Sequence, residues 1–157
     1  MKGYFGSYLD VDLSDGSISN YEIPKKWYKK FLGGRGIAAR ILLEELDSGA
    51  DPLGPENIMV FATGPLQGLN IAGAGRHVVM AKSPKTNSVN GSYVGGFMGQ
   101  ELGKSGYDGI IIRGAASGPK YLVLKGGEAR LEDAEDLWGK ETADFEEQIQ
   151  DREGNVR

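Results

Sequence analysis

Hydrophobic and polar positions alternate with a period of two over the first part of the chain. Residues 4–13 alternate, and a second alternating run covers residues 17–23. Ser14-Asp15-Gly16 between them is a turn signal, so the pattern predicts a β-hairpin. Pro24 ends the second run, because proline cannot supply the backbone N–H that a strand needs.

The period changes from two to that of a helix after Pro24. From Lys25 onward the apolar side chains of Trp27, Tyr28 and Phe31 share one helical face, and Gly33-Gly34 ends this first helix. A second helix is expected after Gly36. Its apolar positions fall at helical spacing and are Ile37, Ile41, Leu42 and Leu46.

The remaining segments combine both kinds of pattern. Continuous apolar runs at 58–62 and 110–112 predict buried strands. The other expected elements are a strand over 76–81, a short helix from Gly95-Gly96 through Lys104 with Gly106 as its C-cap, a hairpin of 121–124 and 129–131, and a surface helix over 142–150. Strands and helices that do not alternate regularly favour an α+β fold of mixed, mostly antiparallel sheets with a few helices. No boundary is visible, so residues 1–157 are interpreted as one domain.

Composition excludes several classes of protein. The net charge is -4 and no basic face is visible, which excludes a nucleic-acid partner. The chain has no cysteine, so it cannot hold an iron–sulfur cluster or use a thiol nucleophile. No apolar run is long enough for a membrane span and no secretory signal is visible, so a cytoplasmic location is expected.

Three familiar motifs are incomplete. The segment 73–78 begins like a dinucleotide fingerprint but lacks the third glycine and precedes a strand. Gly103-Lys104-Ser105 resembles a P-loop but falls at the end of a helix and lacks the first glycine. His77 is the only histidine, and a zinc or iron site needs several ligands. His77 is therefore interpreted as a hydrogen-bonded strand residue.

Glycine is the unusual component, at 25 of 157 residues. Four glycine turns, at 33–36, 64–66, 73–76 and 95–99, contain few but well-placed cations, which are Arg35 and Arg76. Such turns expose backbone N–H groups that bind anions, and arginine matches phosphate oxygens. The turns therefore allow two interpretations, a site for a phosphate-bearing ligand or plain turns with surface arginines.

A series of short motifs runs in order along nearly the whole chain. They include Leu32-Gly33-Gly34-Arg35-Gly36, Pro55-Glu56-Asn57, Thr63-Gly64-Pro65-Leu66, Gly75-Arg76, Lys82-Ser83-Pro84, Gly95-Gly96-Phe97-Met98-Gly99, Gly106-Tyr107-Asp108 and Leu137-Trp138-Gly139. In this order and spacing the chain resembles the N-terminal domain of the aldehyde ferredoxin oxidoreductase family.

The resemblance implies a function that composition does not show. Enzymes of this family oxidise aldehydes to carboxylic acids and pass electrons to ferredoxin through a [4Fe–4S] cluster. Their tungsten, or molybdenum, is held by the dithiolene sulfurs of two pterins, and magnesium bridges the pterin phosphates. The N-terminal domain is the β-rich base beneath this cofactor.

The resemblance also implies the site residues. Arg76 is the expected phosphate contact, and the backbone of Tyr93, Val94, Gly95 and Gly96 is expected to face the pterin or magnesium. No catalytic residue and no side-chain metal ligand is expected. Related enzymes often carry a small polar pair where this chain has Tyr93-Val94, so side-chain contacts there would be altered, whereas backbone contacts would remain.

Family members continue well beyond 157 residues. The cluster cysteines and the acid–base residues are expected in the remainder of the enzyme, either as further domains or as a separate subunit, and the chain by itself is expected to be inactive. An exposed sheet edge would also promote homo-oligomers. Two other hypotheses remain open: a non-catalytic binding or assembly module with this fold, and an unrelated binder of phosphate ligands.

Overall fold

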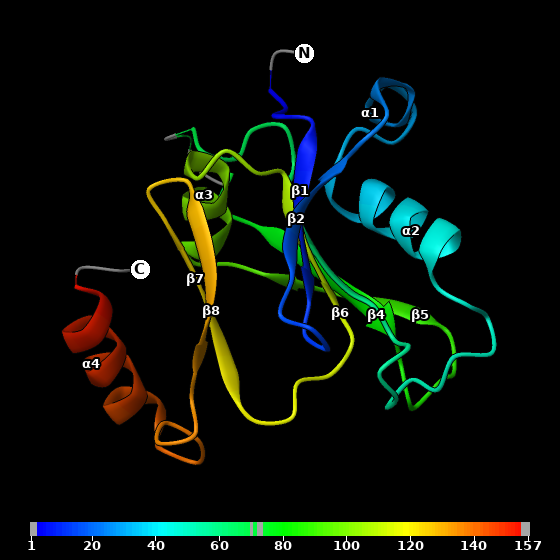
Figure 1. The fold of residues 1–157 in the computed structure, drawn as a ribbon. Helices are drawn as coiled ribbons and strands as arrows, with labels where there is room; N and C mark the ends of the chain where they lie inside the picture. Colours follow the sequence, from blue (N-terminus) through cyan, green and yellow to red (C-terminus); the bar gives the residue numbers. More distant parts are fainter. Residues whose placement is uncertain (1–2, 70, 72–73, 155–157) are drawn as a thin grey trace.

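A six-stranded sheet forms the centre of the molecule (Figure 1). The computed structural model describes residues 3–69, 71 and 74–154. Its elements are β1 (Ser7–Asp12), β2 (Ile18–Glu22), α1 (Lys25–Phe31), α2 (Gly34–Glu45), β3 (Met59–Ala62), β4 (His77–Lys82), β5 (Val89–Val94), α3 (Met98–Lys104), β6 (Gly109–Arg113), β7 (Lys120–Lys125), β8 (Glu128–Asp133) and α4 (Thr142–Glu153). The sheet has the order β2-β1-β6-β3-β4-β5, and β7 and β8 form a separate hairpin.

The fold is α+β, as the pattern predicts. All strand pairs are antiparallel except β1 with β6, which run parallel. The parallel pair requires a long crossover between β1 and β6. The rest of the six-stranded sheet lies within that crossover, so strands distant in sequence meet at the centre.

The two faces of the sheet bury different sets of side chains. Helices α1 and α2 cover one face, and α3 with the β7–β8 hairpin lies on the other (Figure 1). On the α2 face, Ile37, Ile41 and Leu42 pack against strand residues that include Val60 and Val78. On the opposite face, Leu102 of α3 joins a second apolar cluster that includes Leu9, Val11, Ile110, Phe61 and Leu131.

Several boundaries differ from the sequence prediction. Helix α2 begins at Gly34 instead of after Gly36, and α4 continues to Glu153. Strand β5 was not predicted at all. Its sequence, VNGSYV, shows no apolar alternation because β5 is an edge strand whose residues are nearly all exposed.

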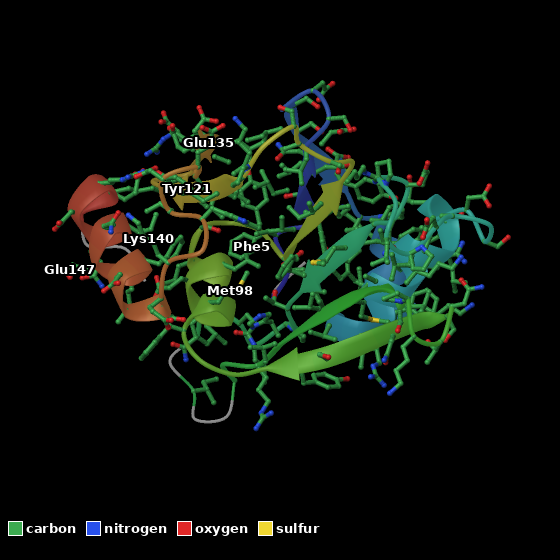
Figure 2. The ribbon with its side chains drawn as sticks, turned by 90° about the horizontal axis from the view of Figure 1, so that it is seen from below. Phe5, Met98, Tyr121, Glu135, Lys140 and Glu147 are labelled. Carbon is green, nitrogen blue, oxygen red and sulfur yellow. The ribbon has the colours of Figure 1, made fainter. Side chains whose placement is uncertain are left out.

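An apolar cleft of about 500 Å³ separates the sheet from the C-terminal part of the chain. Figure 2 shows α3, with Met98, between the sheet and α4, with Glu147. Phe61 of β3, Leu102 of α3 and Leu122 of β7 are among the residues that line the cleft. Helix α4 is tied to the hairpin at its last turn, where Arg130 donates to the Glu153 carboxylate and the Tyr121 hydroxyl donates to it at 3.2 Å.

Within the described residues, every helix is too short or too polar to cross a bilayer.

Candidate functional site

The glycine turns gather at one end of the six-stranded sheet. Antiparallel pairing brings the C-terminal ends of β3 and β5 to the same end of the sheet as the N-terminal end of β4. The turns that follow β3 and β5, and the segment that precedes β4, therefore lie near one another. Gly73 of the third predicted turn lies outside the described residues.

The first two turns are packed main chain against main chain. The N–H of Gly34 donates to the carbonyl oxygen of Thr63 at 2.7 Å. A Cβ added at Gly33 would lie 3.2 Å from that same oxygen and 3.3 Å from the Cα of Gly64. Glycine at position 33 thus permits the close approach of the start of α2 to the end of β3.

The last two turns are packed just as closely. A Cβ at Gly75 would lie 3.2 Å from the carbonyl oxygen of Gly96, and a Cβ at Gly99 would lie 3.2 Å from that of Gly75. On the next turn of α3, a Cβ at Gly103 would come within 2.7 Å of the Gly68 nitrogen. Larger residues at these positions would push α3 away from the segments that flank Arg76.

Arg76 stands exposed at this end of the sheet, one residue before β4. Its main-chain carbonyl accepts a hydrogen bond of 2.6 Å from Nε2 of Gln67. Among the described residues, the Arg76 guanidinium has no hydrogen-bond or ion-pair partner. A guanidinium with unused N–H donors is suited to binding phosphate oxygens in a bidentate manner.

Arg35, the other arginine within a glycine turn, already has interaction partners within this chain. Its guanidinium lies 5.1 Å from the centre of the Tyr93 ring, and its Nη2 donates to the Gly91 carbonyl at 3.3 Å. Tyr93 is paired with Val78, whose side chain belongs to the core beneath α2, so the Tyr93 ring lies on the α2 face. Arg35 therefore covers part of the β5 edge, a common protection of edge strands.

The four residues 93–96 differ in what they offer a ligand. Val94 follows Tyr93 along β5, so its side chain points to the opposite face of the sheet, and it is half exposed. A Cβ at Gly95 or at Gly96 would meet nothing within 4 Å, and Gly96 has a φ of +95°. The main chain at Gly95 and Gly96 is therefore open to close approach by a ligand.

Two buried polar atoms near Arg76 lack partners within the described residues. They are Oε1 of Gln67 and Nδ1 of His77. His77 lies in β4 as expected, and its Nδ1 makes no hydrogen bond within the described residues. Burial lowers the pKa of His77 below its ordinary value, which keeps the ring neutral near pH 7. Nothing in the local sequence singles out Gln67.

The arrangement fits a phosphate-bearing group better than a metal ion held by side chains. The Arg76 guanidinium, which has no partner among the described residues, and the open main chain of Gly95 and Gly96 lie at one end of the sheet. By contrast, no cluster of three or more histidine, aspartate or glutamate side chains suited to a metal ion occurs among the described residues. Tyr93 and Val94 offer no carboxylate or amide oxygen, so a magnesium ion at 93–96 would be limited to main-chain carbonyls from this chain.

Comparison with known proteins gives a consistent result. The family model described as aldehyde ferredoxin oxidoreductase, N-terminal domain, matches residues 8–157. The chain is 39% identical over its whole length to a tungsten-containing aldehyde ferredoxin oxidoreductase of Pyrococcus furiosus, and it spans 26% of that protein. It is 42% identical over 142 residues to the WOR-like subunit of an aliphatic sulfonate oxidoreductase from the same organism, covering 88% of this chain and 22% of that subunit.

A solved structure matches equally well. The active-site complex BamBC of benzoyl coenzyme A reductase, in complex with 1,5-dienoyl-CoA, superposes with a TM-score of 0.94 at 34% sequence identity. The match covers 99% of this chain and 24% of the other. The chain thus spans about a quarter of the length of the relatives that it resembles.

Proposed function

The chain belongs to the aldehyde ferredoxin oxidoreductase family and matches the N-terminal domain of its members. We propose that it is the base on which a longer oxidoreductase holds a tungsten–pterin cofactor. The tungsten-containing relatives, at 39% identity over the whole chain, support this assignment. Molybdenum is the alternative metal for the same cofactor.

The free Arg76 guanidinium is the observation that carries the proposal. Arg76 binds a pterin phosphate, and the main chain of Gly95 and Gly96 approaches the same cofactor from the end of β5. Tyr93 and Val94 contribute main-chain atoms, since the Tyr93 ring is stacked with Arg35. Main-chain carbonyl oxygens of residues 93–96 would be the only ligands that this segment could offer to a magnesium ion.

The chain's own residues bind and orient, and they do not react. The bound cofactor supplies the two-electron redox chemistry. Arg76 would hold the phosphate end of the pterin, and the close glycine packing sets how near the surrounding turns lie to one another. The rest of the enzyme supplies the [4Fe–4S] cluster, the acid–base residues and the surface for ferredoxin.

We further propose that the full-length enzyme oxidises an aldehyde to a carboxylic acid. We also propose that it is located in the cytoplasm. The aldehyde ferredoxin oxidoreductases match over nearly all of the chain, which favours this substrate class over that of the sulfonate oxidoreductase, matched over 88%. Turnover of aldehydes with reduction of ferredoxin by the full-length enzyme would support the assignment. Turnover only of another substrate class would replace it.

The cofactor proposal is tested by replacing Arg76 in the full-length enzyme. Arg76→Ala should lower tungsten occupancy roughly 10- to 100-fold at limiting cofactor, because a charge-assisted hydrogen bond is worth about 1.5–3 kcal/mol. Arg76→Lys should keep part of the tungsten occupancy, since lysine retains the positive charge but lacks the paired N–H donors of a planar guanidinium. Tungsten is measured by elemental analysis of the purified protein.

The matched control is Arg40→Ala. Arg40 lies on α2 and is paired with Glu44, so its loss should leave the metal content unchanged. Full tungsten content in Arg76→Ala would exclude the phosphate contact. A native full-length protein without tungsten or molybdenum would instead favour a non-catalytic binding or assembly module.

A further inference from the structure

We propose that Gln67 is the positioning residue that presents Arg76 to the phosphate of the bound cofactor. The inference rests on the proposed function, and it assigns a role to a side chain that does not itself need to touch the cofactor. Its basis is the hydrogen bond of 2.6 Å from Gln67 Nε2 to the carbonyl oxygen of Arg76.

The main chain of Gln67 is held from two sides. Its own N–H donates to the Gly64 carbonyl at 3.1 Å within the turn that follows β3. A Cβ at Gly103 of α3 would come within 2.8 Å of the Gln67 carbonyl carbon, so α3 lies directly against this turn. The main chain that carries the Gln67 side chain is thus anchored within its own turn and against α3.

The orientation of the Gln67 amide is fixed by its hydrogen bond. Only the NH2 group can donate to a carbonyl, so Nε2 faces Arg76 and Oε1 faces the other way. Oε1 is buried near Gly99, where an added Cβ would lie 3.1 Å from it, and Oε1 has no partner within the described residues. A buried acceptor without a partner lowers stability. The arrangement therefore costs the fold some stability while it holds the main chain of Arg76.

Holding the Arg76 main chain has a direct effect on binding. Arg76 directly precedes β4, and its long side chain has no partner among the described residues. A fixed main chain reduces the number of positions that the guanidinium explores, so less conformational entropy is lost when phosphate binds. The Gln67 contact thus raises affinity through Arg76.

Gln67→Met in the full-length enzyme separates this role from a structural one. Methionine has nearly the same length but removes both the donor to Arg76 and the unpaired Oε1. Tungsten occupancy should therefore fall roughly three- to tenfold, as for loss of one neutral hydrogen bond. The thermal unfolding midpoint of the cofactor-free protein should stay the same or rise. A purely structural role would lower the midpoint together with the occupancy.

Two further variants make the test sharper. Gln67→Glu keeps the shape but places a carboxylate beside the Arg76 carbonyl, so it should lower occupancy at least as much as Gln67→Met. In an Arg76→Ala background, Gln67→Met should cause no additional loss, because a residue that acts through Arg76 has nothing left to position. Gln150→Leu, an exposed glutamine on α4, serves as the control and should change nothing.

The outcomes distinguish the inference from the proposed function. Loss of tungsten in Arg76→Ala with full content in Gln67→Met would overturn the role of Gln67 and leave the phosphate contact standing. Equal losses from Gln67→Met in the wild-type and Arg76→Ala backgrounds would also overturn it. Full tungsten content in Arg76→Ala would remove the phosphate contact and, with it, the role of Gln67.

Discussion

The hydroxyl of Tyr28 donates a hydrogen bond of 2.5 Å to the carboxylate of Asp108, 80 residues away in sequence. The same carboxylate accepts the N–H groups of Phe5 at 3.1 Å and Gly6 at 2.9 Å. The Asp108 carbonyl oxygen accepts the hydroxyl of Thr63 at 2.7 Å. Asp108 therefore joins α1, the segment before β1 and the turn after β3. That last turn is one of the glycine turns of the candidate site.

Tyr28→Phe should destabilise the chain by about 1.5–3 kcal/mol, because it removes a buried hydrogen bond to a charged acceptor. Burial, together with the hydrogen bond to Asp108, raises the pKa of Tyr28 above its ordinary value, so the hydroxyl remains a donor at neutral pH. Urea denaturation gives the free energy of unfolding. Tyr107→Phe is the control, since no hydrogen bond of its hydroxyl occurs among the described residues. Equal effects of the two changes would contradict the prediction.

Gly109→Ala should be far more disruptive than Gly95→Ala. A Cβ at Gly109 would lie 2.0 Å from the ring of the fully buried Tyr8 and 2.4 Å from the carbonyl oxygen of Phe61, and neither can move freely. We expect a loss of about 3 kcal/mol or more. A Cβ at Gly95 meets nothing within 4 Å, so stability should change by less than about 1 kcal/mol. Urea denaturation of both variants is the measurement, and a mild Gly109→Ala would show that β1 can shift away from β6.

The free energy of unfolding should fall as the pH is lowered from about 7.5 to about 5.5. Burial holds the pKa of His77 below its ordinary value of 6.5. The unfolded chain therefore binds a proton in this range before the folded chain does, and the proton favours unfolding. The contribution of neutral His77 to the free energy of unfolding is fully present above the pKa that His77 has in the unfolded chain. It is lost as the pH falls toward the lower pKa that His77 has in the folded chain.

The test compares the wild type with His77→Phe by urea denaturation at several pH values. His77 is the only histidine, so its removal should flatten the dependence between about pH 7.5 and 5.5. The same slope in both proteins would assign the pH dependence to another group.

Lys82→Met should loosen the loop that follows α2. Lys82 is buried, and its Nζ donates to the carbonyl oxygens of Ser48 and Ala50, both at 2.7 Å. Each of these two charge-assisted bonds is worth about 1.5–3 kcal/mol, so the loss of both should cost about 3 kcal/mol or more. Faster hydrogen exchange of residues 46–50 would accompany it. Lys85→Met, at an exposed turn position, should have little effect, and a Lys82→Met protein with unchanged exchange would refute the role.

Local pattern was enough to predict most of the elements. The hairpin of β1 and β2, the helices α1 and α2 and the buried strands β3 and β6 follow from apolar periodicity, because each period reports which side of an element is buried. Strand β5 shows the limit of this rule. Its pairing with β4 is supplied by the main chain, and its exposed side chains leave no apolar signal.

The sequence by itself determined the set of glycine turns, the arginines beside them and the order of motifs that identifies the family. Local pattern did not distinguish Arg35 from Arg76, since each follows a glycine in a glycine-rich turn, and the resemblance to the family alone pointed to Arg76. The tertiary structure decided their contacts: pairing of β5 with β4 places Tyr93 and the Gly91 carbonyl beneath Arg35, while Arg76 meets Gln67 only through its main chain. Such contacts join residues that are far apart along the chain, so no local pattern could have contained them.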